Sequence, residues 1–169
     1  MKYDANCKDC ERLNSFLIQV KNKNPDYFCK PVAPIGQKKP PFLIVGLAPG
    51  MHGANRTGRP FTGDHAGILL YKTLFMFGFA SKSSSVSADD DLILNNCRIT
   101  NAVKCLPPEN KPSLEEVKNC TSFLRVELNN LPNNTIVLAL GLVAHSALLI
   151  ALDCQKNNYK FSHGGRHVL

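Results

Sequence analysis

Apolar residues along this chain follow two spacings, one typical of buried strands and one typical of amphipathic helices. Three short apolar runs have the length and β-branched content of buried parallel strands: residues 42–46, 97–103 and 135–140. Apolar residues at helical spacing mark four helices: residues 9–22, 66–79, 113–128 and 142–152. Since strands and helices alternate, the pattern predicts an α/β fold, with a mostly parallel sheet between two layers of helices.

Several details of this α/β/α arrangement follow from single residues. Ser113, with Glu116 three residues later, has the capping-box pattern that begins a helix. A fourth strand is expected to begin at 167–169, which would make the sheet four-stranded. In the helix at 66–79 we expect five residues to face the core: Leu69, Leu70, Thr73, Leu74 and Phe77.

The remaining segments read as connections. Residues 23–41 are rich in Pro, Lys and Asn and indicate a surface connection, and residues 80–91 are polar and predict a flexible loop. The apolar stretch 136–152 raises the alternative of a membrane span. Gly141 and His145 interrupt that stretch, which favours a strand, a turn and a helix.

Composition narrows the class of protein. The 169 residues suit one domain, and an apolar fraction of 44% is enough for a core. The net charge of +7 favours a polyanionic partner, of which nucleic acid is the most common. No secretory signal opens the chain, so we expect a cytoplasmic protein without membrane segments. In that compartment seven cysteines are metal ligands or buried apolar residues rather than disulfides.

The segment after the first strand carries the strongest chemical signal. Residues 46–64 read GLAPGMHGANRTGRPFTGD, and in an open α/β sheet ligands bind at this end of the strands. Its glycines let the backbone approach a ligand closely. It matches neither the phosphate-binding GxxxxGK[ST] pattern nor GxGxxG. The alternative is a tightly turned connection without chemistry, although a loop of this length is usually functional.

This loop resembles the first motif of the family-5 uracil-DNA glycosylases. Leu47 and Ala48 follow the first glycine, where the related family 4 has an acidic residue. The resemblance extends from Cys7 to about Gly164. It implies a single uracil-DNA glycosylase domain over residues 1–169 that hydrolyses the N-glycosidic bond of uracil, and of other deaminated bases, in DNA by base flipping.

Four cysteines have a spacing that suits a metal site: Cys7, Cys10, Cys105 and Cys120. From the residues alone, four thiolates hold either zinc or an iron–sulfur cluster. The resemblance implies a [4Fe–4S] cluster, because families 4 and 5 place ligands at these positions. Cys29, Cys97 and Cys154 match no ligand position, and we interpret them as buried apolar residues.

The resemblance also assigns the catalytic and base-binding residues. Asp64 is the expected catalytic carboxylate that acts on the water, and its alternative role is the N-cap of the next helix. Asn101 is expected to bind the pyrimidine edge through its amide, and Phe61 to stack on the base unless it is an ordinary core residue. The expected substrate-binding residues also include five from the loop: Gly46, Leu47, Ala48, Pro49 and Gly50.

Other expectations concern DNA and the end of the chain. Arg56 and Arg59 are candidates for phosphate contacts, with surface salt bridges as the alternative. The family's second motif, a His-containing loop, would follow Leu169, so we expect the domain to be truncated there. Double- or single-stranded DNA containing uracil is the expected partner of a monomer. The rival functions are a non-catalytic iron–sulfur or zinc DNA-binding module and an electron-transfer protein, whose cysteines would be more closely clustered.

Overall fold

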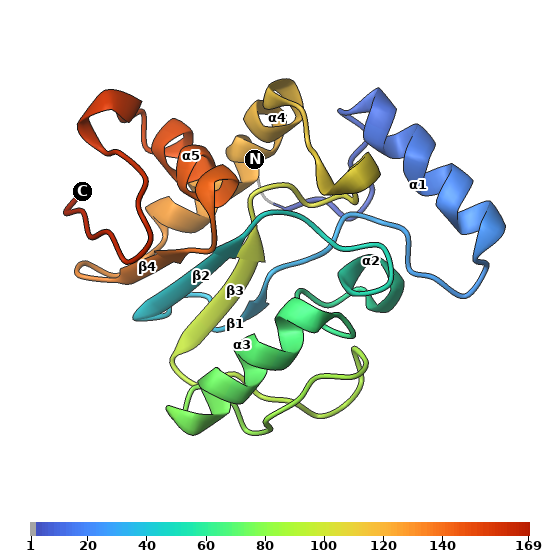
Figure 1. The fold of residues 1–169 in the computed structure, drawn as a ribbon, viewed down its shortest axis with the longest axis horizontal. Helices are drawn as coiled ribbons and strands as arrows, with labels where there is room; N and C mark the ends of the chain where they lie inside the picture. The colour runs from blue at the N-terminus through green and yellow to red at the C-terminus, as the bar shows by residue number, and fades with distance from the viewer. Residues whose placement is uncertain (1–2) are drawn as a thin grey trace.

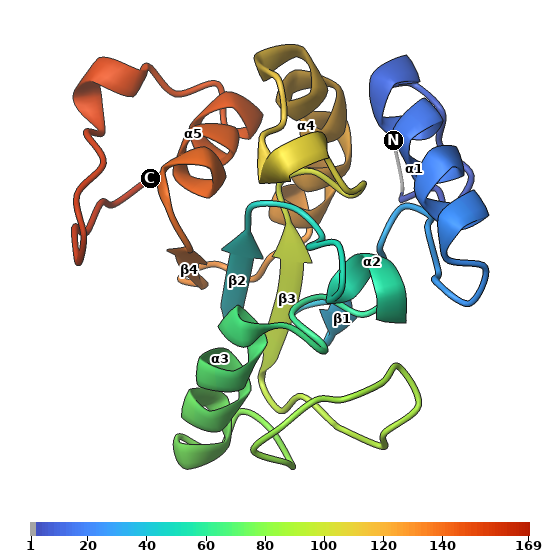
Figure 2. The ribbon, with the colours of Figure 1, turned by 45° about the vertical axis from the view of Figure 1, so that its right-hand side comes forward.

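A four-stranded sheet forms the centre of the computed structural model, which describes residues 3–169. The strands are β1 (Ile35–Gly36), β2 (Phe42–Gly46), β3 (Cys97–Asn101) and β4 (Ile136–Ala139). Their order is β1-β3-β2-β4, with β2 parallel to both β3 and β4 and β1 antiparallel to β3 (Figure 2). This confirms the predicted four-stranded, mostly parallel sheet.

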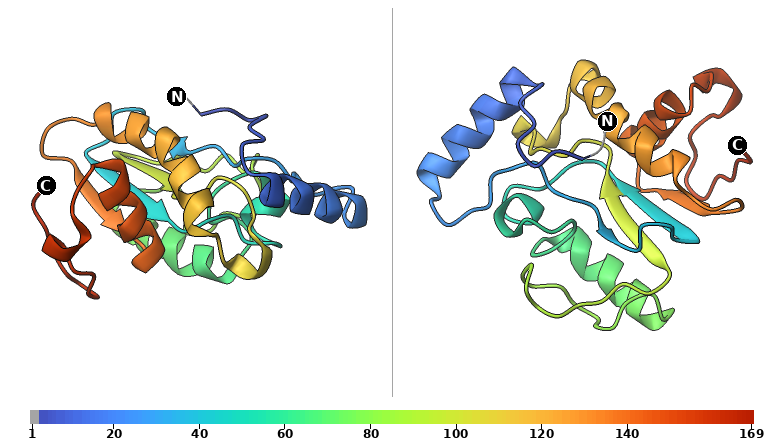
Figure 3. Two further views of the ribbon diagram at one scale, coloured as in Figure 1. Left: turned by 90° about the horizontal axis from the view of Figure 1, so that it is seen from above. Right: turned by 180° about the vertical axis from the view of Figure 1, so that it is seen from behind.

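Helices cover both faces of the sheet (Figure 1). The α-helices are α1 (Glu11–Lys23), α2 (Ala54–Thr57), α3 (His65–Met76), α4 (Leu114–Asn129) and α5 (Leu142–Ala151). Short 3-10 turns occur at Pro108–Asn110 and Lys156–Asn158. Figure 3 shows α1, α4 and α5 on one side of the sheet and α3 on the other, which confirms the predicted three layers.

The core consists of two apolar clusters separated by the sheet. Leu43 and Val45 point to the side of α1, α4 and α5, whereas Ile44 points to α3. Neighbouring residues of a strand alternate between faces, so a central strand covered on both sides is apolar throughout. This explains the unbroken apolar run at 42–46.

The fourth strand is β1, and the prediction of a strand at 167–169 is wrong. Residues 165–169 have no regular secondary structure. β1 instead pairs its two residues with Ile99 and Arg98 at the free edge of β3. A two-residue strand in a Pro- and Lys-rich segment leaves no periodic apolar signal, so residues 23–41 read only as a surface connection.

The predicted core face of α3 is also partly wrong. Tyr71 and Leu74 are buried, whereas Leu69 and Phe77 are 71% and 72% exposed. The segment is apolar on almost every side, so its spacing alone does not determine which stripe faces the sheet.

The apolar stretch at 136–152 folds as β4, a turn at Gly141 and α5, as the strand–turn–helix interpretation predicts. Within residues 3–169, no helix has both the length and the apolar character needed to cross a membrane.

The capping box of α4 generates a stability prediction. The Ser113 hydroxyl accepts a hydrogen bond from the Glu116 N–H, and the Glu116 carboxylate accepts one from the Ser113 N–H. We expect Ser113→Ala to lower the free energy of unfolding by about 1 kcal/mol, measured by denaturant titration. Ser122→Ala is the control on the same helix, because this exposed hydroxyl bonds only within the helix. Equal losses in the two variants would contradict a specific role for the cap.

Candidate functional site

The carboxyl ends of β2 and β3 lie side by side at one edge of the sheet. Gly46, the last residue of β2, pairs in register with Asn101, the last residue of β3. The pairing continues past both strands, because the N–H groups of Ala102 and Val103 donate to the carbonyls of Gly46 (2.8 Å) and Leu47 (2.9 Å). The start of the glycine loop is therefore fixed to the segment that carries Asn101.

Three predicted substrate residues meet at this edge: Gly46, Phe61 and Asn101, here called the Gly46 cluster. A Cβ atom on Gly46 would lie 2.5 Å from both the Asn101 Oδ1 and the Phe61 ring, so only glycine leaves room for these side chains. Asn101 is 3% exposed, and its Oδ1 has no hydrogen-bond partner within residues 3–169. A buried amide oxygen without a partner is costly unless a ligand or water satisfies it.

The backbone of Phe61 is in the left-handed region, with φ of 54°. A non-glycine residue holds this conformation only where its surroundings fix it. The carbonyl of Pro60 accepts from the buried Tyr71 hydroxyl (2.9 Å), and the Thr62 hydroxyl is 2.7 Å from that of Ser85. Both neighbours of Phe61 are thus tied to other segments, which fixes the ring against Gly46.

Asp64 is the N-cap of α3, and its carboxylate also faces the glycine loop. Oδ1 accepts a hydrogen bond from the Gly67 N–H at 2.8 Å. Oδ2 approaches Gly53 so closely that a Cβ atom there would lie 2.3 Å away, and it also lies near Gly50. The capping role is therefore present, while one carboxylate oxygen makes no hydrogen bond to the described part of the chain.

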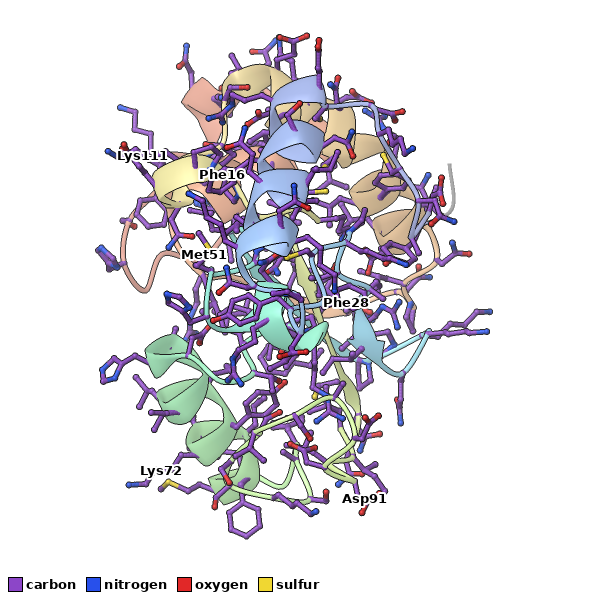
Figure 4. All side chains as sticks on the ribbon, turned by 90° about the vertical axis from the view of Figure 1, so that its right-hand side faces the viewer. Phe16, Phe28, Met51, Lys72, Asp91 and Lys111 are labelled. Atoms are coloured by element: carbon purple, nitrogen blue, oxygen red, sulfur yellow. The ribbon has the colours of Figure 1, made fainter. Side chains whose placement is uncertain are left out.

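The other loop residues of the predicted set follow Gly46 at the same edge of the sheet. Leu47, Ala48 and Gly50 are partly buried, and Pro49 is buried. Met51 and Phe16, both labelled in Figure 4, pack against the larger apolar cluster. Since neither residue directly after Gly46 is acidic, Asp64 is the carboxylate that the loop offers.

The two arginines of the loop have different surroundings. The Arg59 guanidinium forms an ion pair with Asp90 and donates to the Ala88 carbonyl at 2.6 Å. This is the salt-bridge alternative for Arg59. Arg56 is exposed and donates through Nε to the His52 carbonyl at 2.7 Å, and its Nη2 lies against Gly63.

Residues 80–91 form an irregular loop, as their composition predicts, and Asp90 attaches it to the glycine loop. Burial acts to raise the pKa of Asp90, but hydrogen bonds from the Val86 backbone and the Arg59 guanidinium outweigh it and hold that pKa well below its usual range. Asp90 also accepts from the backbone of Ser87 and Leu92. One acidic residue thus organises the segment and attaches it to the glycine loop.

The four predicted metal-binding cysteines line one cavity. Cys7 and Cys10 precede α1, Cys105 follows β3, and Cys120 lies within α4. The cavity walls also include six further residues: Asp9, Leu13, Asn14, Pro31, Lys104 and Phe123. Burial raises the pKa of Cys120 to about 11, and it raises that of Cys105 further, with a contribution from the charge of the other three thiols. Cysteines that influence one another in this way have come together from three distant segments.

This cavity does not have the geometry of a single-ion site. In the described part of the chain, no three His, Cys, Asp or Glu side chains are close enough together to hold one metal ion. The remaining cysteines differ: Cys29 and Cys97 are buried as predicted, but Cys154 is only partly buried. Its position after α5, near the surface, explains why the apolar interpretation fails there.

Sequence reasoning missed two charged residues of this region. Lys104 is buried beside Cys105, and Glu127 on α4 forms an ion pair with it at 2.9 Å. It also missed His145 on α5, whose buried Nε2 has no partner in residues 3–169. For Lys104, the signal in the sequence was its position between Asn101, a predicted pocket residue, and Cys105, a predicted metal ligand.

A family model described as the uracil DNA glycosylase superfamily matches residues 33–167, which include β1 to β4 and the Gly46 cluster. The chain belongs to this superfamily. A type-5 uracil-DNA glycosylase of Thermus thermophilus is 41% identical over 175 residues, covering 96% of this chain and 80% of the relative. A type-5 enzyme of Pyrobaculum aerophilum is 44% identical, covering 95% of this chain and 71% of the relative.

Type-4 relatives are more distant. A type-4 uracil-DNA glycosylase of Pyrobaculum aerophilum is 36% identical over 115 residues, which cover 68% of this chain and half of the relative. The greater similarity to type 5 agrees with the absence of an acid after Gly46 and confirms the family resemblance of the sequence.

The ion pair between Arg59 and Asp90 generates a prediction for acid stability. Because folding lowers the pKa of Asp90, its ionised carboxylate stabilises the folded state. This stabilisation is fully present above the pKa of about 4 in the unfolded chain, and it is lost progressively as pH falls from there toward the lower pKa of the folded state. We expect Asp90→Asn to lower the free energy of unfolding at pH 7 by about 1.5–3 kcal/mol. In denaturant titrations from pH 7 to pH 3, the difference from wild type should shrink as the pH falls. Asp89→Asn, an exposed neighbour, serves as control, and a difference that stays constant with pH would contradict the assignment.

Proposed function

We propose that this protein is a uracil-DNA glycosylase that hydrolyses the bond between uracil and deoxyribose in DNA. The observation that carries the proposal is the Gly46 cluster, in which a buried amide without a partner and an aromatic ring converge on one glycine. The similarity to type-5 enzymes supports the same activity. Uracil is the proposed substrate base, and release of other deaminated bases is to be tested in the same way.

The chemistry requires that the target base leave the duplex and enter a site that recognises its edge. We assign recognition of the base to Asn101, whose amide offers both a donor and an acceptor. Phe61 offers an aromatic face for stacking, and Gly46 allows the backbone to come close to the base. Leu47, Ala48, Pro49 and Gly50 complete the proposed binding site.

Asp64 is the proposed catalytic carboxylate. Departure of the base leaves positive charge on the sugar, and a nearby carboxylate both stabilises that charge and orients or deprotonates the attacking water. The free Oδ2 supports this role, while Oδ1 is held by the α3 cap and fixes the side chain.

The proposed partner is DNA, bound by a monomer in the cytoplasm. The net charge of +7 supports binding to phosphates. Arg56 is exposed and remains a candidate for a phosphate contact, whereas Arg59 is held by Asp90 and is a weaker candidate. Seven cysteines without a disulfide support a reducing compartment.

We also propose that Cys7, Cys10, Cys105 and Cys120 hold a [4Fe–4S] cluster. Four cysteines from three separate segments line one cavity, which supports a shared site, and the similarity to type-5 and type-4 enzymes favours a cluster there. A cluster held by these four thiolates would join the residues before α1, the segment after β3 and the middle of α4. The cysteines then act as a long-range structural restraint.

The function is tested by release of free uracil from a uracil-containing duplex. We expect wild type to release uracil and Asp64→Asn to lose about 10²–10⁴-fold in single-turnover rate, because a positioned base contributes that much. Asn keeps much of the capping capacity, so the melting temperature should change little. Asp89→Asn removes the same charge from an exposed site and should retain the wild-type rate.

The outcomes distinguish the alternatives. Wild type that binds DNA without releasing uracil would contradict the proposed enzyme and favour a non-catalytic DNA-binding module. An unchanged rate in Asp64→Asn, with wild type active, would remove Asp64 from the chemistry and leave only its cap.

The cluster is tested by metal content after anaerobic purification. We expect about four irons and four acid-labile sulfides per chain, as the cluster type requires. Cys105→Ser should lose iron and melt at a lower temperature. Cys154→Ser should keep the wild-type iron content and melting temperature, because Cys154 lies outside the cavity. Stoichiometric zinc without iron would reject the iron–sulfur cluster but would still support a metal site at the four cysteines.

A further inference from the structure

Lys104 is a buried lysine that neither the proposed chemistry nor the proposed cluster uses. It is 1% exposed, and its ammonium group donates to the Thr100 hydroxyl, the Asn101 carbonyl (2.9 Å) and a Glu127 carboxylate oxygen (2.9 Å). Lysine is almost never fully buried without such partners, since removing its charge from water is costly. Three acceptors match its three N–H groups, so the ammonium orientation is fixed.

The contact with Asn101 acts on the backbone of the Gly46 cluster. The ammonium holds the Asn101 carbonyl, and the next two N–H groups of the chain donate to Gly46 and Leu47. The Lys104 side chain thus folds back under the end of β3 and closes a loop of the main chain. The position of the Asn101 amide depends on this short segment.

The other end of the Lys104 contact network is α4. Glu127 accepts from Lys104 and Thr100 on Oε1 and from Arg98 on Oε2 at 3.1 Å. Burial acts to raise the pKa of Glu127, but the charges of Lys104 and Arg98 outweigh it and lower that pKa, so the carboxylate is ionised. The Lys104 ammonium group is therefore held between Glu127 on α4 and the end of β3.

Lys104 also borders the cysteine cavity. It lines that cavity together with Cys105, the next residue of the chain, and its carbonyl accepts from the Val32 N–H at 2.7 Å. The same residue therefore contacts the Asn101 carbonyl through its side chain and lies in the wall of the cysteine cavity.

We propose that Lys104 is a positioning residue that fixes Asn101 for base recognition, because its ammonium group bridges the Asn101 carbonyl and the Glu127 carboxylate. The part of this inference that concerns uracil rests on the proposed function. The part that concerns the backbone at Asn101 does not.

The experiment compares a charge-neutral double variant with a matched control. Lys104→Met with Glu127→Gln removes the ammonium without leaving a buried carboxylate opposite it, while Arg98 keeps its hydrogen bonds to the Gly36 and Gln37 carbonyls. Arg98→Met removes another ion pair of Glu127 and leaves Lys104 and its contact with Asn101 in place. Hydrogen exchange is measured for the backbone amides of Ala102 and Val103. Uracil release is measured at several substrate concentrations to give kcat and KM.

In the double variant we expect exchange at Ala102 and Val103 to be faster by on the order of tenfold, and exchange in α5 to be unchanged. We expect kcat/KM for uracil release to fall by about 10–100-fold, because a small displacement of a recognising group has that effect. Arg98→Met should lower the melting temperature without either change. Thr100→Val removes one acceptor of the ammonium with little change of shape, and should shift the same two amides in the same direction.

Wild-type exchange and wild-type kcat/KM in both the double variant and Thr100→Val would overturn the inference. Equal changes in Arg98→Met would overturn it as well, since they would reflect general loss of stability. If wild type releases no uracil, the proposed function fails, and the exchange of Ala102 and Val103 still decides whether Lys104 positions this segment.

Discussion

The parallel pairing of β2 with β3 fixes the relation between all the proposed functional groups. Gly46 and Asn101 end their strands opposite one another, so the glycine loop begins at the same edge as the Asn101 amide, the proposed recognition group. A slip of one residue would turn every side chain of a strand to the other face. Leu43 and Val45 on one face and Ile44 on the other are all buried, so such a slip would disrupt both apolar clusters. Core packing thereby determines the geometry of the site.

The glycine loop is rigid for a different reason. It contains a residue, Phe61, in a backbone conformation that costs about 1–3 kcal/mol for a non-glycine side chain. The contacts of its neighbours with Tyr71 and Ser85, together with the ion pair between Arg59 and Asp90, offset that cost. The segment 80–91 thus acts as a support for the loop, and the aromatic ring is held in place before any ligand arrives.

The elements that could be predicted from the sequence are those with a local cause. The apolar run of β2, the capping box at Ser113 and the alternation of strands with helices have such causes, and the convergence of the cysteines followed from the family resemblance. The features that the sequence did not reveal have non-local causes. β1 pairs with the free edge of β3, and segment 80–91 is attached to Arg59, more than twenty residues away.

The candidate site was predictable as a set of residues but not as a geometry. Gly46, Phe61 and Asn101 meet because Gly46 lacks a Cβ atom, and the motif contains that glycine without stating which side chains use the space. Lys104 was missed because a buried lysine looks like any surface lysine in a sequence, and only its partner on α4 marks it as interior.

The segment after β3 connects the two proposed functional regions. Asn101 ends the strand, Lys104 turns back to hold its carbonyl, and Cys105 enters the cysteine cavity. Only Ala102, Val103 and Lys104 lie between Asn101 and Cys105, so a displacement at Cys105 has a short path along the chain to Asn101. Lys104 also ties this segment to Glu127 on α4. A group that binds the four cysteines would therefore do more than join α1 to α4, since it would also hold the end of the strand that carries the proposed base-recognising residue, Asn101.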